Sequence, residues 1–317
     1  MSVLLRPLAV ADLPAVVELM NDARRVDGSS EVMTLDELAD ELDGDRVVLE
    51  TDTRIALDGD TIVGVVYTFN LPSDVREVRC YVFGTVHPEH RRRGIGTELM
   101  QWAIERARVQ VSAGPSNLPR YIRVNALEQT EGAHALFRSL GMQPVRTHES
   151  LIRPVRPALQ VDNPAGVRIT PWPDERSEEI RQTKNAAFAD HWGSTPVSPD
   201  DWHAMTHGYG ARLDLSLVAL DDDDHIIGYC LNKRFPDDDA LKGRAEGSID
   251  NLATLRAWRG RGVASALVAR SVDLFAAAGL SHALIDVDAE NPTGAARLYR
   301  HLGFEIVERS ITSQLGL

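Results

Sequence analysis

Residues 254–275 read TLRAWRGRGVASALVARSVDLF, where a strand-like run ends, an arginine- and glycine-rich stretch follows, and an apolar-striped segment begins at once. Glycines let an anion approach the backbone closely, and the first turn of a helix offers unpaired N–H groups together with the positive end of the helix dipole. Phosphate suits such a helix start best. The stretch therefore predicts a strand–loop–helix unit that holds a phosphate group.

The same arrangement occurs a second time, at residues 86–104, which read VHPEHRRRGIGTELMQWAI. Further along, TEGAHALFRSLGM (130–142) aligns without gaps with PTGAARLYRHLGF (292–304). We infer a duplicated module of roughly 150 residues. The chain is divided into a first half at 1–153, a proline-rich linker at 154–166 and a second half at 167–317.

Composition narrows the class of protein. The 317 residues include 34 Lys and Arg against 47 Asp and Glu, a formal net charge of −13, which disfavours a nucleic-acid partner. We expect no membrane span and no signal peptide, because long apolar runs and a basic leader are missing, so a cytoplasmic location is expected. Cys80 and Cys230 lie in apolar, strand-like runs and are interpreted as buried thiols in a reducing compartment.

Hydrophobic periodicity predicts one order of elements in both halves. For the first half we expect, in order, a short strand at 3–8, a helix over 12–24, a helix from 34, strands near 46–51 and 53–57, strands at 61–70 and 77–86, a long helix after the glycines, a strand at 121–126, a helix at 130–140 and two closing strands. For the second half we expect a strand at 167–170, helices over 174–189 and from 198, strands at 215–220 and 226–235, a strand at 246–254, a helix that ends at Gly279, a strand at 283–288, a helix at 292–302 and two closing strands.

Both glycine stretches follow the pattern Arg/Gln-x-x-Gly-x-Gly/Ala between a strand and a helix. Arg91-x-x-Gly94-x-Gly96 matches it in the first half, and Arg259-x-x-Gly262-x-Ala264 matches it in the second. Together with DVDAENPTGAARLYRHLGF (286–304), this chain resembles the GCN5-related N-acetyltransferase family, once per half. In length and layout it resembles the mycothiol synthases, which are tandem members of that family.

The resemblance implies an α/β (α+β) fold in which each half is a mixed, mostly antiparallel sheet flanked by helices. The fourth and fifth strands of each half would run parallel and separate, and the pantetheine arm of acetyl-CoA would enter the gap. Cofactor contacts are implied for Leu252, Ala253, Thr254, Arg259, Gly260, Arg261, Gly262, Val263, Ala264 and Asn291 in the second half, and for Gly84, Thr85, Val86, Arg91, Arg92, Arg93, Gly94, Ile95 and Gly96 in the first.

Transfer of an acetyl group to an amine needs a base for the amine proton and an acid for the departing thiolate. The resemblance assigns the acid to Tyr299. Period-two alternation along EGSIDNLAT (246–254) puts Glu246, Ser248, Asp250 and Leu252 on one face, so Asp250 is the expected base and Glu246 the reserve candidate. The first half carries Phe137 and Val82 at the positions of Tyr299 and Asp250, which predicts a non-catalytic first half.

The acceptor is expected to be the primary amine of a small molecule. His191 and Trp192 lie in the segment that forms the acceptor side in this family, and Lys233 is a further candidate contact. Direct acetyl transfer needs no metal, and no metal-ligand spacing stands out. Two alternatives stay open. One is a mycothiol synthase proper, although this chain has Ser248 at a position where those enzymes carry Glu. The other is a non-catalytic protein that binds or senses acyl-CoA.

Overall fold

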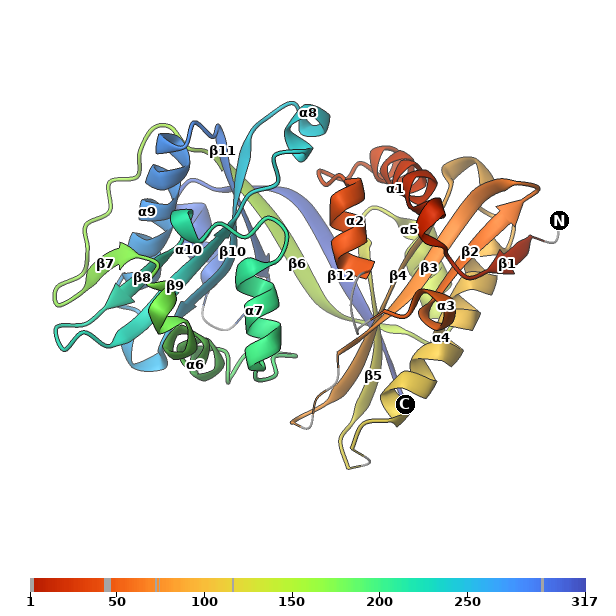
Figure 1. Ribbon diagram of the computed structural model, residues 1–317, viewed down its shortest axis with the longest axis horizontal. Coiled ribbons are helices and arrows are strands. Elements are labelled where there is room, and N and C mark those ends of the chain that lie inside the picture. The colour runs from red at the N-terminus through yellow and green to blue at the C-terminus, as the bar shows by residue number, and fades with distance from the viewer. Residues whose placement is uncertain (1–2, 43–46, 72, 74, 116, 292–293) are drawn as a thin grey trace. The chain divides into compact units, whose positions relative to one another are not determined.

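The computed structural model describes residues 3–42, 47–71, 73, 75–115, 117–291 and 294–317. The chain forms two compact units (Figure 1). Unit 1 comprises Met1–His148 together with Glu308–Leu317, and unit 2 comprises Glu149–Val307. The ends of the two units therefore differ from the division that the sequence suggested, because the final ten residues return to unit 1.

Unit 1 is built on a mixed sheet in the order β1-β2-β3-β4-β5-β12. Its strands are β1 (Leu4–Arg6), β2 (Thr53–Asp58), β3 (Thr61–Leu71), β4 (Val78–Val86), β5 (Arg120–Leu127) and the last part of β12 (Glu305–Gly316). The β4–β5 pair is parallel, and the other described pairs of this unit are antiparallel. This is the mixed, mostly antiparallel sheet that was expected.

Helices cover both faces of the unit 1 sheet because the strand residues alternate between two apolar clusters. The helices are α1 (Leu13–Asp27), α2 (Leu35–Leu42), α3 (Leu49–Asp52), α4 (Ile95–Ser112) and α5 (Glu131–Ser139). In β3, Val65 packs with α1 and α2, whereas Val66 packs with α4 and α5 on the other face. Helix α2 begins with a capping box, since Thr34 and Glu37 exchange side-chain-to-backbone hydrogen bonds of 3.2 Å.

Unit 2 repeats this architecture, with a sheet in the order β6-β11-β10-β9-β8-β7. Its strands are β6 (Gln143–Pro154, of which the part from Glu149 belongs here), β7 (Arg168–Pro171), β8 (Leu217–Leu220), β9 (Ile226–Lys233), β10 (Glu246–Thr254) and β11 (His282–Asp288). Strands β10 and β11 are parallel, and the β7–β8, β8–β9 and β9–β10 pairs are antiparallel.

Two apolar clusters again flank the sheet of unit 2. The helices are α6 (Ser177–Ala187), α7 (Pro199–His207), α8 (Asp238–Lys242), α9 (Val263–Ala277) and α10 (Ala295–His301). On one face, Cys230 and Ile249 pack with α9 and α10. On the other face, Tyr229 and Leu231 pack with α6 and α7. The site described below lies at the carboxyl end of β10.

Each half of the sequence supplies the last strand of the other half's unit. Strand β12 ends against β5 in unit 1, with Ser310–Gly316 paired to Leu127–Tyr121. Strand β6 ends in unit 2, beside β11. The prediction of two closing strands per half is wrong, because each half closes with one strand of twelve residues. A continuous extended run suits a strand that must reach from one unit into the other.

Three further local expectations differ from the structure. A strand was expected near 46–51, but the structure has the short helix α3 at Leu49–Asp52. The backbone N–H of Val48 donates to the buried carboxylate of Asp52. Residues 154–166 are not a free linker but belong to unit 2, where Leu159 and Val161 pack on the core. Helix α8 was not expected. Residues 292 and 293, placed by the sequence at the start of a helix, lie outside the described residues.

Candidate functional site

The parallel strands of unit 2 separate before they end. Residues Glu246–Ile249 of β10 pair with His282–Ile285 of β11, yet β10 continues to Thr254 and β11 to Asp288. In unit 1 the β4–β5 register likewise ends at Val82 and Val124, while β4 continues to Val86. The expected separation of the fourth and fifth strands is therefore confirmed in both units. It leaves one backbone edge of β10 open for an extended ligand.

A β-bulge in β10 marks the point where unit 2 opens. The β9–β10 register passes from Ile249 to Asn251, so Asp250 is the extra residue. Its carboxylate lies 3.2 Å from the ammonium of Lys233 on β9. The two residues predicted separately as base and acceptor contact therefore form one pair at the opening. Strand β4 pairs with β3 in regular register, so unit 1 lacks this feature.

The bulge also corrects the predicted face of Leu252. Ser248 is paired with Lys233, and Leu252 is paired with Cys230. Lys233 and Cys230 are three residues apart on one strand, so they point to opposite faces. Leu252 accordingly packs on the α9 side, whereas Asp250 faces Lys233 on the α6 side. Simple period-two alternation failed because a bulge adds one residue to the strand.

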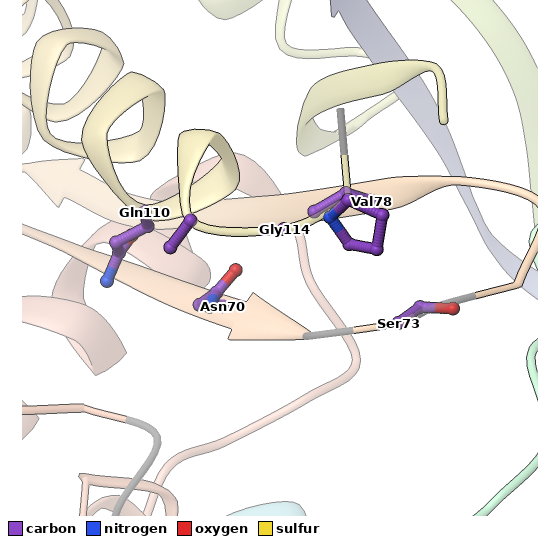
Figure 2. A pocket seen from close by; sticks show the side chains of 7 residues that line it. Asn70, Ser73, Val78, Gln110 and Gly114 are labelled. Carbon is purple, nitrogen blue, oxygen red and sulfur yellow. The ribbon is translucent and has the colours of Figure 1, made fainter. Parts of the chain in front are cut away.

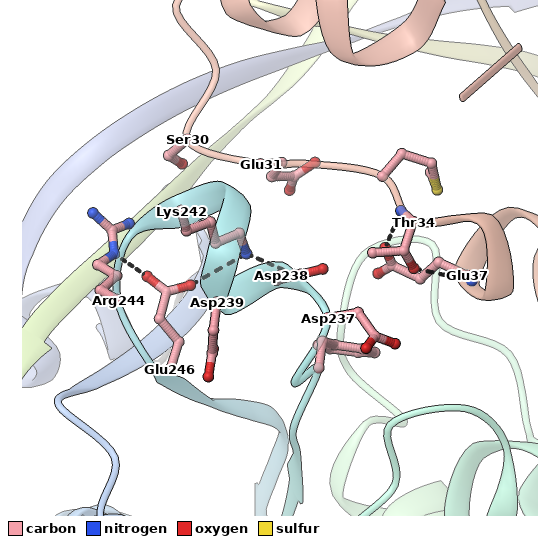
Figure 3. Close-up of polar contacts among 12 residues, drawn as sticks. Ser30, Glu31, Thr34, Glu37, Asp237, Asp238, Asp239, Lys242, Arg244 and Glu246 are labelled. Atoms are coloured by element: carbon pink, nitrogen blue, oxygen red, sulfur yellow. Dashed lines mark hydrogen bonds and ion pairs between the residues drawn. The ribbon is translucent and has the colours of Figure 1, made fainter. Parts of the chain in front are cut away.

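Glu246 is placed away from the opening, at the first residue of β10. Its carboxylate is buried and pairs with Lys242 at 3.2 Å and with Arg244 (Figure 3). Lys242 also pairs with Asp238 at 2.9 Å. Because β10 runs eight residues from Glu246 to its other end, this carboxylate is a member of a structural ion-pair network, and its proposed role as reserve base is not supported by its position.

Helix α9 begins at the glycine stretch as the sequence predicts. Gly262 is the residue before the helix and has a φ of 89°, a left-handed conformation that favours glycine. Among the described residues, no heavy atom lies within 4 Å of a Cβ built on Gly260. At Gly262 an added Cβ would lie 3.6 Å from Pro164, so the open space that an anion could enter lies beside Gly260. Gly94 repeats this geometry before α4, with a φ of 88°.

The first side chains of helices α4 and α9 are buried in the core. Val263 and Ile95, the first residues of α9 and α4, are buried in the apolar clusters of their units. Ala264 and Gly96 follow them in the first turn. At these four positions the backbone N–H groups, and not the side chains, are therefore what each helix start can offer to a phosphate.

Two of the arginines for which the resemblance implied cofactor contacts are paired with carboxylates. Arg259 holds Asp190, and Arg91 holds Asp27, each through a forked pair of hydrogen bonds. Arg261 lies over the ring of Trp258, 4.8 Å from its centroid. In the first stretch, Arg92 has a φ of 64°, and Arg93 donates to the carbonyl of Glu89.

The strand residues before each stretch lie at the open edge. Ala253 and Thr254 pair with Tyr229 and Gly228 on the β9 side, and the Oγ1 atom of Thr254 is buried without a hydrogen-bond partner in the described part of the chain. In unit 1, Thr85 and Val86 occupy the corresponding end of β4. Packing explains why residue 84 is a glycine, because an added Cβ would lie 2.5 Å from the carbonyl oxygen of Val65.

Tyr299 lies in α10 on the α9 side of the sheet, in the same apolar cluster as Leu252 and Cys230. Burial raises the pKa of the Tyr299 phenol well above its ordinary value, and the neighbouring Cys230 adds to this shift. The hydroxyl therefore stays protonated at neutral pH and can donate. Phe137 is buried in α5 of unit 1 and offers no such proton. Asn291 forms the turn after β11, where its N–H donates to the carbonyl of Asp288.

His191 and Trp192 lie in residues 188–198, the segment between α6 and α7, which we name the acceptor loop. The imidazole of His191 packs edge-to-face on Phe188, with ring centroids 4.5 Å apart. Burial lowers the pKa of His191, and the nearby Asp190 opposes this shift. The carboxylate of Asp288, the last residue of β11, opposes it as well.

A cavity of about 420 Å³ lies elsewhere, in unit 1 (Figure 2). Its lining includes Asn70 at the end of β3, Val78 at the start of β4 and Gln110 near the end of α4. Since the glycine stretch follows the other end of β4, this cavity is distinct from the predicted cofactor position. None of the predicted site residues lines it.

Among the described residues, no group of three or more His, Cys, Asp or Glu side chains is arranged to hold a metal ion. The described helices are also too short or too polar for any of them to cross a membrane. Both cysteines are buried and unpaired with one another, and burial raises the pKa of each thiol to about 12.

A sequence profile of the Acetyltransferase (GNAT) family matches residues 13–142 and again residues 177–304. The two matches fall one in each half and together cover most of the chain. The chain belongs to the GNAT acetyltransferase family. It is accordingly an acyltransferase with two GNAT modules in tandem, of a family that uses acyl-CoA cosubstrates.

Curated relatives of this GNAT protein carry the name mycothiol acetyltransferase. One from Parafrankia sp. is 27% identical over 95% of this chain and 94% of its own length. Another, from Mycolicibacterium paratuberculosis, is 32% identical over 69% of this chain and 68% of its own length. Length and layout therefore agree with the tandem enzymes that the sequence resembles.

Solved structures agree in fold. A GCN5-related N-acetyltransferase from Sphaerobacter thermophilus superposes with a TM-score of 0.81 at 24% identity, covering 99% of this chain and 95% of its own. A tandem GNAT protein from the clavulanic acid biosynthesis pathway gives a TM-score of 0.77 at 18% identity, covering 99% and 98%. At these identities the likeness shows the fold alone.

Two residues that matter for the site were missed from the sequence. Asp190 and Asp27 pair with Arg259 and Arg91, and each is far along the chain from its arginine. A signal existed: Asp27 is the last residue of α1, and Asp190 lies three residues after the end of α6. It was not used because no periodicity connects a helix end to a distant loop.

Proposed function

We propose that this GNAT protein transfers an acetyl group from acetyl-CoA to the primary amine of a small molecule, and that unit 2 carries the chemistry. The observation that supports this most directly is the combination at the end of β10. The strand opens, bulges at Asp250 beside Lys233, and leads into the glycine stretch before α9. Unit 1 opens in the same way but has no bulge and no carboxylate there.

The residues present fit an acyl-CoA. The start of α9 offers backbone N–H groups to the pyrophosphate, and Leu252, Ala253 and Thr254 offer a strand edge to the pantetheine amides. Open space at Gly260 admits a phosphate close to the backbone. When bound, acetyl-CoA supplies a thioester carbonyl that an amine can attack.

Two side chains would then handle the protons. The carboxylate of Asp250 accepts a proton from the acceptor amine, directly or through a water molecule, so that the nitrogen lone pair can form the new C–N bond. As the C–S bond breaks, the phenol of Tyr299 donates its proton to the departing sulfur. Burial raises the pKa of this phenol, so the proton is present at neutral pH, and the same shift makes the phenol a weaker acid.

The two groups flank β10 on opposite faces. Asp250 faces Lys233 and the α6 side, whereas Tyr299 clusters with Leu252 on the α9 side. An amine would therefore approach from the side of the acceptor loop, where His191 and Trp192 lie, and the sulfur would lie toward α10. This division separates base from acid, as transfer between two substrates requires.

A second candidate is the activity named in the relatives, acetylation that yields mycothiol. The alignment with the Parafrankia protein over 95% of this chain favours it. Under this reading the acceptor is the deacetylated form of mycothiol. Ser248, which is paired with Lys233 next to the bulge, is the position at which this chain departs from the pattern expected of those enzymes.

A thiol-release assay tests both candidates. The purified protein is mixed with acetyl-CoA and a panel of small primary amines that includes deacetylated mycothiol, and free CoA is measured against time. Amine-dependent release, together with the acetylated amine in the mass spectrum, supports the proposal, and the best amine decides between the candidates. Tight acetyl-CoA binding without release by any amine contradicts it.

A further inference from the structure

Arg259 makes four hydrogen bonds to protein atoms. Its Nη1 atom donates to Asp190 at 2.7 Å, and its Nη2 atom donates to the other carboxylate oxygen at 3.1 Å. Nη2 also donates to the carbonyl of Ala187 at 2.6 Å, and Nε donates to the carbonyl of Thr254 at 3.3 Å. These contacts involve all three guanidinium nitrogens and join the end of β10 to the end of α6. We call this set of arginine contacts the clamp.

Unit 1 builds the same clamp from its own residues. Arg91 donates from Nη1 and Nη2 to the two oxygens of Asp27, at 2.5 and 2.8 Å. Its Nε donates to the carbonyl of Val86, the last residue of β4, at 3.1 Å. Because two copies of the motif arginine make the same three contacts, the clamp is a repeated feature of this chain and not an accident of one loop.

The clamp neutralises the charge that a phosphate would need. Hydrogen bonds from Arg259 lower the pKa of Asp190 to about 2, so the pair is a carboxylate and a guanidinium throughout the neutral range. A forked arginine–carboxylate pair fixes orientation as well as distance. What it orients is the acceptor loop, since Asp190 is followed at once by His191 and Trp192.

We propose that Arg259 is a positioning residue that fixes the acceptor loop against the end of β10, and not a ligand of the cofactor phosphate. This inference rests on the proposed function, because the acceptor loop matters only if an amine binds there. The clamp sets where His191 lies relative to the opened strands, and the glycine backbone binds the pyrophosphate. Loss of the clamp should therefore weaken the acceptor amine and spare acetyl-CoA.

The test compares Arg259→Gln, Arg259→Lys and Asp190→Ala with the unaltered protein. In each variant the KM of the best amine should rise about tenfold, the scale of one charged hydrogen-bonded pair, while the Kd of acetyl-CoA stays within about threefold. Arg259→Lys is the sharpest variant, because it keeps the positive charge and loses the forked geometry. The double variant Arg259→Gln/Asp190→Ala should be no worse than either single change.

Arg270→Gln is the matched control, because it removes an exposed arginine–aspartate pair on α9 and should change neither constant. Amide hydrogen exchange in residues 187–195 is a readout that does not need turnover, and it should be faster in all three clamp variants. A tenfold or greater loss of acetyl-CoA affinity in Arg259→Gln, with amine KM unchanged, would overturn the inference.

If the unaltered protein transfers acetyl groups to no amine, the proposed function fails. The hydrogen-exchange and acetyl-CoA Kd measurements still test whether Arg259 positions the loop. Faster exchange with unchanged Kd supports the positioning role in that case. Unchanged exchange, or a tenfold weaker Kd in Arg259→Gln, refutes it.

Discussion

Single positions distinguish the two halves of this chain. Tyr299 and Phe137 are equivalent in the repeat and both are buried, so one hydroxyl is the difference between them. The gapless alignment was enough to predict this pair from the sequence. The role of Arg259 was not predictable in the same way, because its partner Asp190 is 69 residues distant and a motif does not show which charge is already neutralised.

Tyr299→Phe removes the proposed proton donor and keeps the ring that packs in the apolar cluster. We expect kcat to fall roughly tenfold to a thousandfold, with acetyl-CoA affinity almost unchanged. Since burial raises the pKa of this phenol well above its usual value, ionisation of Tyr299 should cause no loss of kcat below about pH 10. A pH series of steady-state rates checks both statements. Unchanged kcat in the variant assigns the acid role elsewhere.

Gly262→Val places a branched side chain on a residue with a φ of 89° at the start of α9. The backbone must leave the left-handed region, so the N–H groups no longer face the phosphate. Acetyl-CoA affinity should fall at least tenfold, about 1.4 kcal/mol, by calorimetry. Gly94→Val is the matched control in unit 1, with a φ of 88°, and it should leave kcat within a few fold. The reverse pattern would mean that unit 1 holds the productive site.

At the scale of elements, local patterns predicted most of the helices and strands but failed where a strand departs from its period. The helix starts at Gly94 and Gly262 and the cap at Thr34 follow from residue chemistry alone. The bulge at Asp250 does not, because an extra residue in a strand is a property of its pairing with β9. Asp250 thus lies on the same face as Ser248, as predicted, whereas Leu252 lies on the opposite face, contrary to the prediction.

Gly84→Ala tests whether this glycine serves the sheet. An added methyl group would lie 2.5 Å from the carbonyl oxygen of Val65 on β3, so the two strands must move apart. The free energy of unfolding should fall by about 1–3 kcal/mol, measured by denaturant titration. Gly132→Ala in α5 is the control, since no described heavy atom lies within 4 Å of its added Cβ, and its stability should stay equal or rise. Equal stability of the two variants would contradict the packing role of Gly84.

At the scale of the whole molecule, the two modules share strands although each has its own core. Repetition of the sequence predicted two modules and the fold of each one. It did not predict that residues 308–317 belong to unit 1, because the repeat shows which segments are equivalent and not which copy of a strand pairs with which sheet.

Deletion of residues 308–317 should therefore damage the distant half of the chain. Without Ser310–Gly316, strand β5 keeps β4 on one side but loses β12 on the other and becomes an unprotected edge. We expect limited proteolysis with mass spectrometry to show cleavage within residues 1–148 while 149–307 persists, and we expect the shortened protein to aggregate. Resistance of residues 1–148 equal to that of the full chain would show that β12 is dispensable.

The shared strands also set the order in which a nascent chain can mature. Domains in most multidomain proteins complete themselves one after another as they leave the ribosome, the earliest first. Here the earlier module cannot complete its sheet until β12 (Glu305–Gly316) has been translated, because β12 is its sixth strand. The later module receives its own exchanged strand, β6, well before the rest of it exists. We therefore expect unit 2 to complete its sheet first, while β5 of unit 1 remains an unpaired sheet edge until β12 has been made.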